Sequence, residues 1–222
     1  AAERAAADAA AATGQLRGQL TIGLIPTVTA VDVPAALREF HRAHPAVRIA
    51  LRGGGSDELV ATIDAGEVDI AVLGLPETAP PQRVRTRELV RDRLVAVLSG
   101  HHRLSGRDTL DLSDLAEESF ADFPAGTPGR AQSDLAFAAA GLRREVAFEA
   151  MDTGLMLGLV RQDLAIALLA PALVPSSPDL TAIRVTNGPT RIEYLAWSNF
   201  NPSRATLAFL EALEPQLGSG GD

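Results

Sequence analysis

Apolar side chains recur first with the period of a strand and then with that of a helix along the first third of the chain. From Leu20 to Ile25 they fall on both faces of an extended segment, which is typical of a strand covered on both sides. Apolar positions at helical spacing predict a helix over Val33–Ala43. A strand, a helix and a third strand follow at Val47–Leu51, Ser56–Gly66 and Val68–Leu75. Strands that alternate with helices predict a parallel sheet.

The same patterns return after a break at Thr78–Gln82. The chain closes with a predicted helix that has Asn201 as its N-cap and Pro202 at its first position. Between these points the periodicities predict strands at Arg93–Ser99, Ser119–Phe123, Arg144–Ala150, Leu164–Pro171 and Arg191–Ser198, and helices at Leu110–Ser119, Ala131–Leu142 and Met151–Asp163. We therefore expect two α/β lobes joined by crossing strands, with a cleft between them.

Two hydroxyl side chains, Thr27 and Thr29, come directly after the first predicted strand, which stops at Pro26. Ligands of open α/β sheets bind beyond the carboxyl ends of the strands. We therefore expect both threonines to lie beside a ligand site.

Composition and charge exclude several classes of function for this chain. The chain has 222 residues, a formal net charge of -8 and no cysteine, so thiolate metal sites and thiol catalysis are excluded. Non-specific DNA binding needs a basic surface, so this chain is not expected to hold nucleic acid by itself. No apolar run approaches the ~20 residues that cross a bilayer, and the first residues do not have the pattern of a secretion signal.

The chemical motifs of enzymes and metal sites are missing from the sequence. Gly53-Gly54-Gly55 is not followed by the Gly-Lys-Ser/Thr of a phosphate loop, and no Gly-x-Ser-x-Gly elbow occurs. His41 and His44 have metal-ligand spacing but no third ligand near them, so a solvated helix end is expected. We predict no catalytic residues, no cofactor and no metal site.

Three segments together resemble one family. They are GQLTIGLIPTVTAVDVPAALREFHRAHPAVRIALRGGGSDELVATIDAGEVDIAVLG, RDRLVAVLSGHHRLSGRDTLDLSDLAEESF and LGLVRQDLAIALLAP. Their order and spacing resemble the effector-binding domain of LysR-type transcriptional regulators, from about Gln15 to Leu217. Asp163 and Ala165 stand where the family usually has two glycines. Asp tolerates positive φ better than most residues, so we expect the turn to survive.

The resemblance implies two Rossmann-like lobes with a fold like that of type 2 periplasmic binding proteins. Residues 1–17 are expected to be the end of a linker helix, residues 18–88 with 198–217 the first lobe, and residues 89–197 the second. The family's N-terminal winged helix-turn-helix is expected to be absent from this chain. The resemblance also implies that the full-length cytoplasmic protein forms a homodimer or homotetramer, binds DNA through that domain and responds to a small-molecule effector. No membrane contact is expected.

The matching positions predict an effector site formed by Thr27, Val28, Ser56, Gly74, Ala125, Gly126, Thr127, Arg130, Asp152 and Thr153. Simpler roles remain open for some of them. Thr27 and Ser56 can serve only as helix N-caps, and Arg130 can pair with Asp134 four residues on. Three acids near the predicted cleft edges, Asp57, Asp122 and Asp152, would repel an anion. We therefore expect a cationic or neutral polar effector.

Two other readings of the chain remain. A solute-binding protein of the same fold would need a secretion signal or a lipid-anchoring cysteine. An enzyme of this fold would need a catalytic pair in the cleft.

Overall fold

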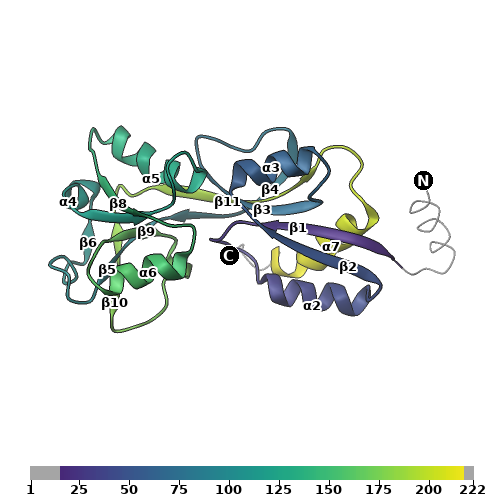
Figure 1. The fold of residues 1–222 in the computed structure, drawn as a ribbon, viewed down its shortest axis with the longest axis horizontal. Coiled ribbons are helices and arrows are strands. Elements are labelled where there is room, and N and C mark those ends of the chain that lie inside the picture. The colour runs from purple at the N-terminus through teal and green to yellow at the C-terminus, as the bar shows by residue number, and fades with distance from the viewer. Residues whose placement is uncertain (1–15, 218–222) are drawn as a thin grey trace.

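The computed structural model describes residues 16–217, which form two lobes arranged along the long axis of the molecule (Figure 1). The expected linker helix at residues 1–17 falls almost entirely outside the described part. Among residues 16–217 no helix is long and apolar enough to cross a membrane.

The first lobe is built on a five-stranded sheet of order β2-β1-β3-β11-β4. As expected, β1 pairs in parallel with both β2 and β3, whereas β11 runs antiparallel to β3 and β4. The bounds are β1 (Gly18–Leu24), β2 (Val47–Gly53), β3 (Ile70–Pro76), β4 (Val84–Arg93) and β11 (Thr190–Ser198).

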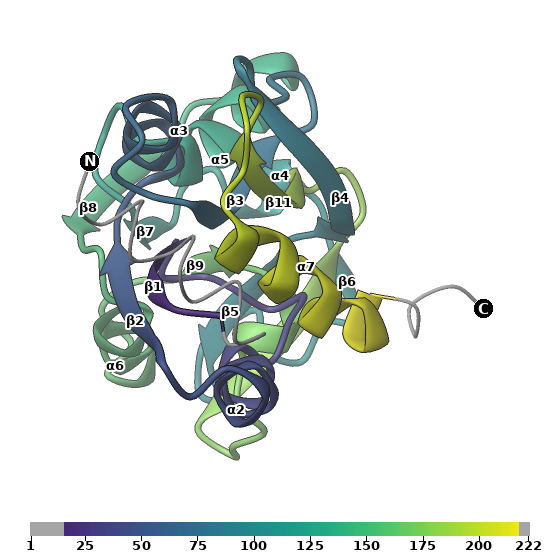
Figure 2. The same cartoon turned by 90° about the vertical axis from the view of Figure 1, so that its right-hand side faces the viewer.

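Helices cover both faces of this sheet, which explains why its central strands are apolar throughout. Ile70 and Val72 of β3 face α2 (Val33–Ala43) and α7 (Arg204–Leu217), where Phe40 and Phe209 meet edge to face with ring centroids 5.4 Å apart. The alternate residues of β3 pack under α3 (Ser56–Asp64). Figure 2 shows α2 and α7 at the end of the first lobe that faces the viewer.

The second lobe contains a four-stranded sheet of order β6-β10-β5-β9 and a parallel pair, β7 and β8. Its helices are α4 (Leu112–Leu115), α5 (Pro128–Ala139) and α6 (Thr153–Arg161), with a short 3-10 turn at Pro171–Leu173. Its strands are β5 (Val95–Ser99), β6 (Thr109–Leu110), β7 (Ser119–Asp122), β8 (Glu145–Glu149), β9 (Ala167–Leu169) and β10 (Leu180–Val185).

Two antiparallel strands, β4 and β11, connect the lobes. The strand predicted at Arg93–Ser99 is wrong at its start, because β4 ends at Arg93 in the first sheet and β5 begins at Val95 in the second. Residues 89–93 and 190–197 were expected in the second lobe, but they lie in β4 and β11 of the first sheet. The remaining lobe limits stay a prediction.

The helix caps differ from expectation at three places. Asp32, not Thr27, caps α2, and its carboxylate accepts from the amide of Ala35 at 2.9 Å. Ser203, not Asn201, caps α7: its hydroxyl accepts from the amide of Thr206 at 3.0 Å, while Asn201 has a φ of 50°. Ser56 is the first residue of α3 rather than its cap, and Gly55 occupies the cap position. The turn at Asp163 forms as expected, because this residue adopts a φ of 56°.

Candidate functional site

A hollow lined by residues of both lobes lies between them, and we call it the cleft. It contains about 520 Å³ of empty space, including space open to solvent. It is lined by Ile25, Pro26, Thr27, Gly55, Ser56, Gly74, Leu94, Phe123, Thr127, Pro128, Gly129, Gln132, Met151, Leu168, Leu169, Ala170, Leu173 and Arg191. Its walls therefore come from the end of β1, the starts of α3 and α5, and the strands β3, β9 and β11.

Four of the ten predicted effector residues line the cleft: Thr27, Ser56, Gly74 and Thr127. The other six are not among its lining residues: Val28, Ala125, Gly126, Arg130, Asp152 and Thr153. Gly126 instead borders a neighbouring hollow with Thr127. Contact of any of the ten with an effector stays a prediction.

The hydroxyl of Ser56 is engaged inside the first lobe. It donates to the carbonyl of Gly74 and accepts from the amide of Gly74, both at 3.0 Å. A Cβ at Gly74 would lie 2.8 Å from Cδ1 of Ile25, so any larger residue here would require the Ile25 side chain to shift. Ser56 therefore ties the start of α3 to β3 beneath the cleft.

Thr127 is the N-cap of α5 at the second wall of the cleft. Its hydroxyl accepts from the amide of Arg130 at 3.3 Å and donates to the carbonyl of Pro124 at 2.8 Å. Gly129 follows in the first turn, where a Cβ would lie 2.8 Å from the Phe123 ring. The cap and the glycine together bring α5 close to the cleft.

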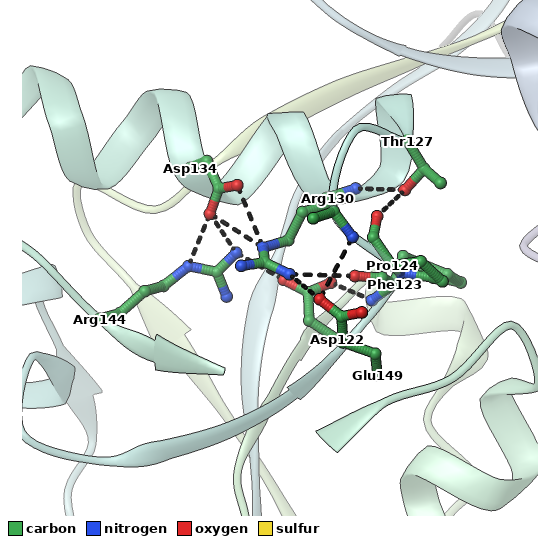
Figure 3. A network of polar contacts seen from close by, with 9 residues as sticks. Asp122, Phe123, Pro124, Thr127, Arg130, Asp134, Arg144 and Glu149 are labelled. Carbon is green, nitrogen blue, oxygen red and sulfur yellow. Dashed lines mark hydrogen bonds and ion pairs between the residues drawn. The ribbon is translucent and has the colours of Figure 1, made fainter. Parts of the chain in front are cut away.

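An ionic network behind this wall holds the loop between β7 and α5 (Figure 3). The guanidinium of Arg130 contacts Asp134 at 3.1 Å and Glu149 at 3.0 Å, and donates to the carbonyl of Phe123 at 3.3 Å. The pairing of Arg130 with Asp134, which the sequence left open, is therefore formed. Arg130 supports the loop from outside the cleft.

Asp122 belongs to the same network and is buried against Arg144, with an N–O distance of 2.6 Å. Burial raises the pKa of the Asp122 carboxyl, while the positive charge of Arg144 opposes the rise. Arg144 also contacts Asp134 at 2.7 Å and lies over the Phe120 ring, 5.0 Å from its centroid.

None of the three acids expected to repel anions lines the cleft, although each is next in sequence to a lining residue. Their effect on an anion stays a prediction. Asp122 is paired with Arg144. Asp152 is the N-cap of α6 and accepts from the amide of Leu155 at 2.6 Å. Asp57 borders two neighbouring hollows instead.

Sequence reasoning missed a buried charged cluster on β11. Arg191 donates to the carbonyl of Thr27 at 3.0 Å and pairs with Asp92 at 3.2 Å and with Glu193. Glu193 accepts in turn from the loop that follows β1. In the sequence, Arg191 and Glu193 lie on the same face of an otherwise apolar strand, and this pattern could have indicated the cluster.

Gln132 was also missed. It lies on α5, it is only 7% exposed, and it lines the cleft. A polar residue on the buried face of a helix was the signal that could have identified it. Among residues 16–217 no cluster of three or more His, Cys, Asp or Glu could hold a metal ion.

Comparison with known proteins shows which family the chain belongs to. Residues 13–218 match the family model of the LysR substrate binding domain. The regulator ShiR of Corynebacterium glutamicum is 31% identical over 161 residues, 71% of this chain and 54% of that protein. The chain therefore spans about half the length of this curated relative.

Solved structures share the fold. The effector binding domain of QuiR in complex with shikimate has a TM-score of 0.76 at 24% identity, covering 92% of this chain and 97% of that one. The BenM effector binding domain with benzoate has a TM-score of 0.73 at 19% identity, covering 91% and 93%. The relatives are regulators rather than enzymes, and a periplasmic solute-binding protein is not favoured. The expected two-lobe fold is confirmed, and the chain belongs to the LysR substrate-binding domain family.

Proposed function

We propose that this chain is the ligand-sensing domain of a LysR-type transcriptional regulator. A small molecule binds in the cleft, changes how the two lobes sit on β4 and β11, and so controls DNA binding by the whole protein. The observation that carries the proposal is the cleft itself. It joins polar residues from both lobes, Thr27 and Ser56 on one side and Thr127 on the other, within apolar walls, as small-molecule sites do.

The whole protein is proposed to be a cytoplasmic homodimer or homotetramer that binds DNA through a winged helix-turn-helix domain outside this chain. The net charge of -8 supports a protein in which a separate domain binds DNA and the ligand-sensing domain does not. No cofactor is needed for this role.

Thermal shift with a metabolite panel tests the proposal, and shikimate and benzoate are the first probes because domains of the same fold hold them. A ligand at a hundred times its Kd adds about 2.7 kcal/mol of stability. For a chain of this size that is a rise of roughly 5–10 °C in Tm.

A glycine pair localises any binding to the cleft. Gly129→Ala forces the Phe123 ring to move and should weaken binding, whereas Gly158→Ala adds a Cβ in open space on α6 and should not. A hit that both variants bind as well as the native domain would place its site elsewhere and contradict the proposal.

A further inference from the structure

Five polar or charged side chains line the cleft, and three of them already have partners. Ser56 is bonded to Gly74, Thr127 caps α5, and Arg191 is paired with Asp92 and Glu193. The remaining two are Thr27 and Gln132. Within residues 16–217, neither the hydroxyl of Thr27 nor the carboxamide of Gln132 forms a hydrogen bond with the protein.

Most of each residue is buried, since Thr27 is 9% and Gln132 is 7% exposed. Their polar atoms are not among the fully buried ones without a partner, which belong to Asp122, Arg144 and Arg191. The hydroxyl and the carboxamide therefore face the space of the cleft, where a bound molecule can supply the hydrogen bonds that the protein does not. One comes from each lobe: Thr27 follows β1 and Gln132 lies on α5. They are therefore placed to be satisfied together by one molecule held between the lobes.

The charge of the lining determines what kind of molecule fits. Arg191 is the only charged residue among the described residues that line the cleft. Its positive charge is already matched by the carboxylates of Asp92 and Glu193. Nε of Arg191 has no hydrogen-bond partner, but the charge of this guanidinium is paired with two carboxylates. An organic anion would therefore find no unpaired cation in the lining, and an organic cation no free carboxylate. Burying an unpaired charge is strongly unfavourable.

We propose that Thr27 and Gln132 form a polar pair that holds an uncharged, largely apolar effector carrying hydroxyl or carboxamide groups. Both side chains donate and accept hydrogen bonds, so each matches a group that does the same. The apolar remainder of the effector contacts lining residues such as Leu94, Phe123 and Leu168. This inference rests on the proposed function and names its ligand class.

The first test needs no ligand. Gln132→Met removes a carboxamide that has no protein partner, so Tm should stay level or rise by roughly 2–4 °C. The matched control is Gln216→Met, which removes a side chain that accepts from the amide of Asp32 at 2.8 Å and donates to its carbonyl at 3.1 Å. Its Tm should fall.

A second matched pair tests Thr27. Thr27→Val should leave Tm unchanged. Thr29→Val removes a hydroxyl that donates to Glu193 and accepts from Arg191, and it should lower Tm. If Gln132→Met and Thr27→Val lower Tm as much as their controls do, these side chains are structural and the inference is overturned.

The second test uses 4-hydroxybenzamide and 4-hydroxybenzoate as probes of equal shape and different charge, titrated into the domain by calorimetry. The amide should bind at least about tenfold more tightly, and Gln132→Met should weaken it by about tenfold. Preference for the carboxylate, or amide binding that neither variant alters, overturns the inference. If neither probe binds, the Tm comparisons of Gln132→Met and Thr27→Val with their controls decide whether the inference stands. Shikimate or benzoate binding that both variants leave intact would overturn this inference while the proposed function stands.

Discussion

The carboxylate of Glu193 accepts hydrogen bonds from the backbone amide of Thr29 at 3.0 and 3.1 Å, although the two residues are 164 positions apart. Glu193 is completely buried on β11, and it also accepts from the hydroxyl of Thr29 and from the amide of Ala30 at 3.1 Å. The strand that returns from the second lobe therefore holds the loop that carries Thr27 into the cleft. A shift of β11 between the lobes would move this loop as well.

We expect Glu193→Gln to lower the free energy of unfolding by about 3–5 kcal/mol, because it leaves Arg191 with one carboxylate fewer and turns an amide group toward backbone donors. Urea unfolding measures the loss. Glu88→Gln is the control, because Glu88 forms only an exposed pair with Arg91 at 3.3 Å and should change stability by less than about 0.5 kcal/mol. Equal effects of the two substitutions would contradict a structural role for Glu193.

Ser56→Ala should destabilise the domain through β3 rather than through a lost helix cap. It removes two buried hydrogen bonds to Gly74, and we expect a loss of about 1–3 kcal/mol. Differential scanning calorimetry measures the change. Ser177→Ala affects an exposed loop, where the hydroxyl accepts from the amide of Asp179 at 3.3 Å, and should be nearly neutral. A neutral Ser56→Ala would show that Gly74 finds other partners.

The stability of the domain should depend on pH through Asp122. Burial raises the pKa of this carboxyl in the folded state above its ordinary value of 3.8. Between 3.8 and the raised value the folded state binds more protons than the unfolded state, so the contribution of Asp122 to stability falls as pH rises. The difference in unfolding free energy between native protein and Asp122→Asn should therefore decrease with rising pH in acidic solution. A difference that grows with pH would mean that pairing with Arg144 outweighs burial.

The domain should not bind duplex DNA. Its net charge of -8 opposes the release of counterions that drives non-specific binding. Fluorescence anisotropy with a labelled duplex at low salt checks this. Sub-micromolar binding would show that the domain carries a DNA-binding surface.

Self-association is expected through the helices α2 and α5 of the two lobes. Leu135 on α5 is 50% exposed, and Leu135→Glu should weaken the dimer in sedimentation equilibrium. Leu207→Glu on α7, where the side chain is 46% exposed, is the matched control and should leave association unchanged. A native domain that stays a monomer at high concentration would argue against this interface, as would equal weakening by both variants.

The sequence alone determined the first lobe up to β3, because its periodicities are local. A strand covered on both faces and a helix with one apolar face are each visible within about ten residues. The same reasoning placed Thr27 at the end of a strand, and the family resemblance named Thr127; both line the cleft. The turn at Asp163 was also predicted from residue type.

Only the tertiary structure decided the features that depend on distant partners. Most of β4 was missed because just one of its residues, Val84, is buried, and the strand is defined by its pairing with β11 about a hundred residues later. The hydroxyl of Ser56 turned to Gly74 instead of capping its helix. Glu193 and Gln132 read as ordinary polar residues in the sequence. The packing of β11 and α5 buries both, gives Glu193 its partners, and leaves Gln132 facing the cleft without one among the described residues.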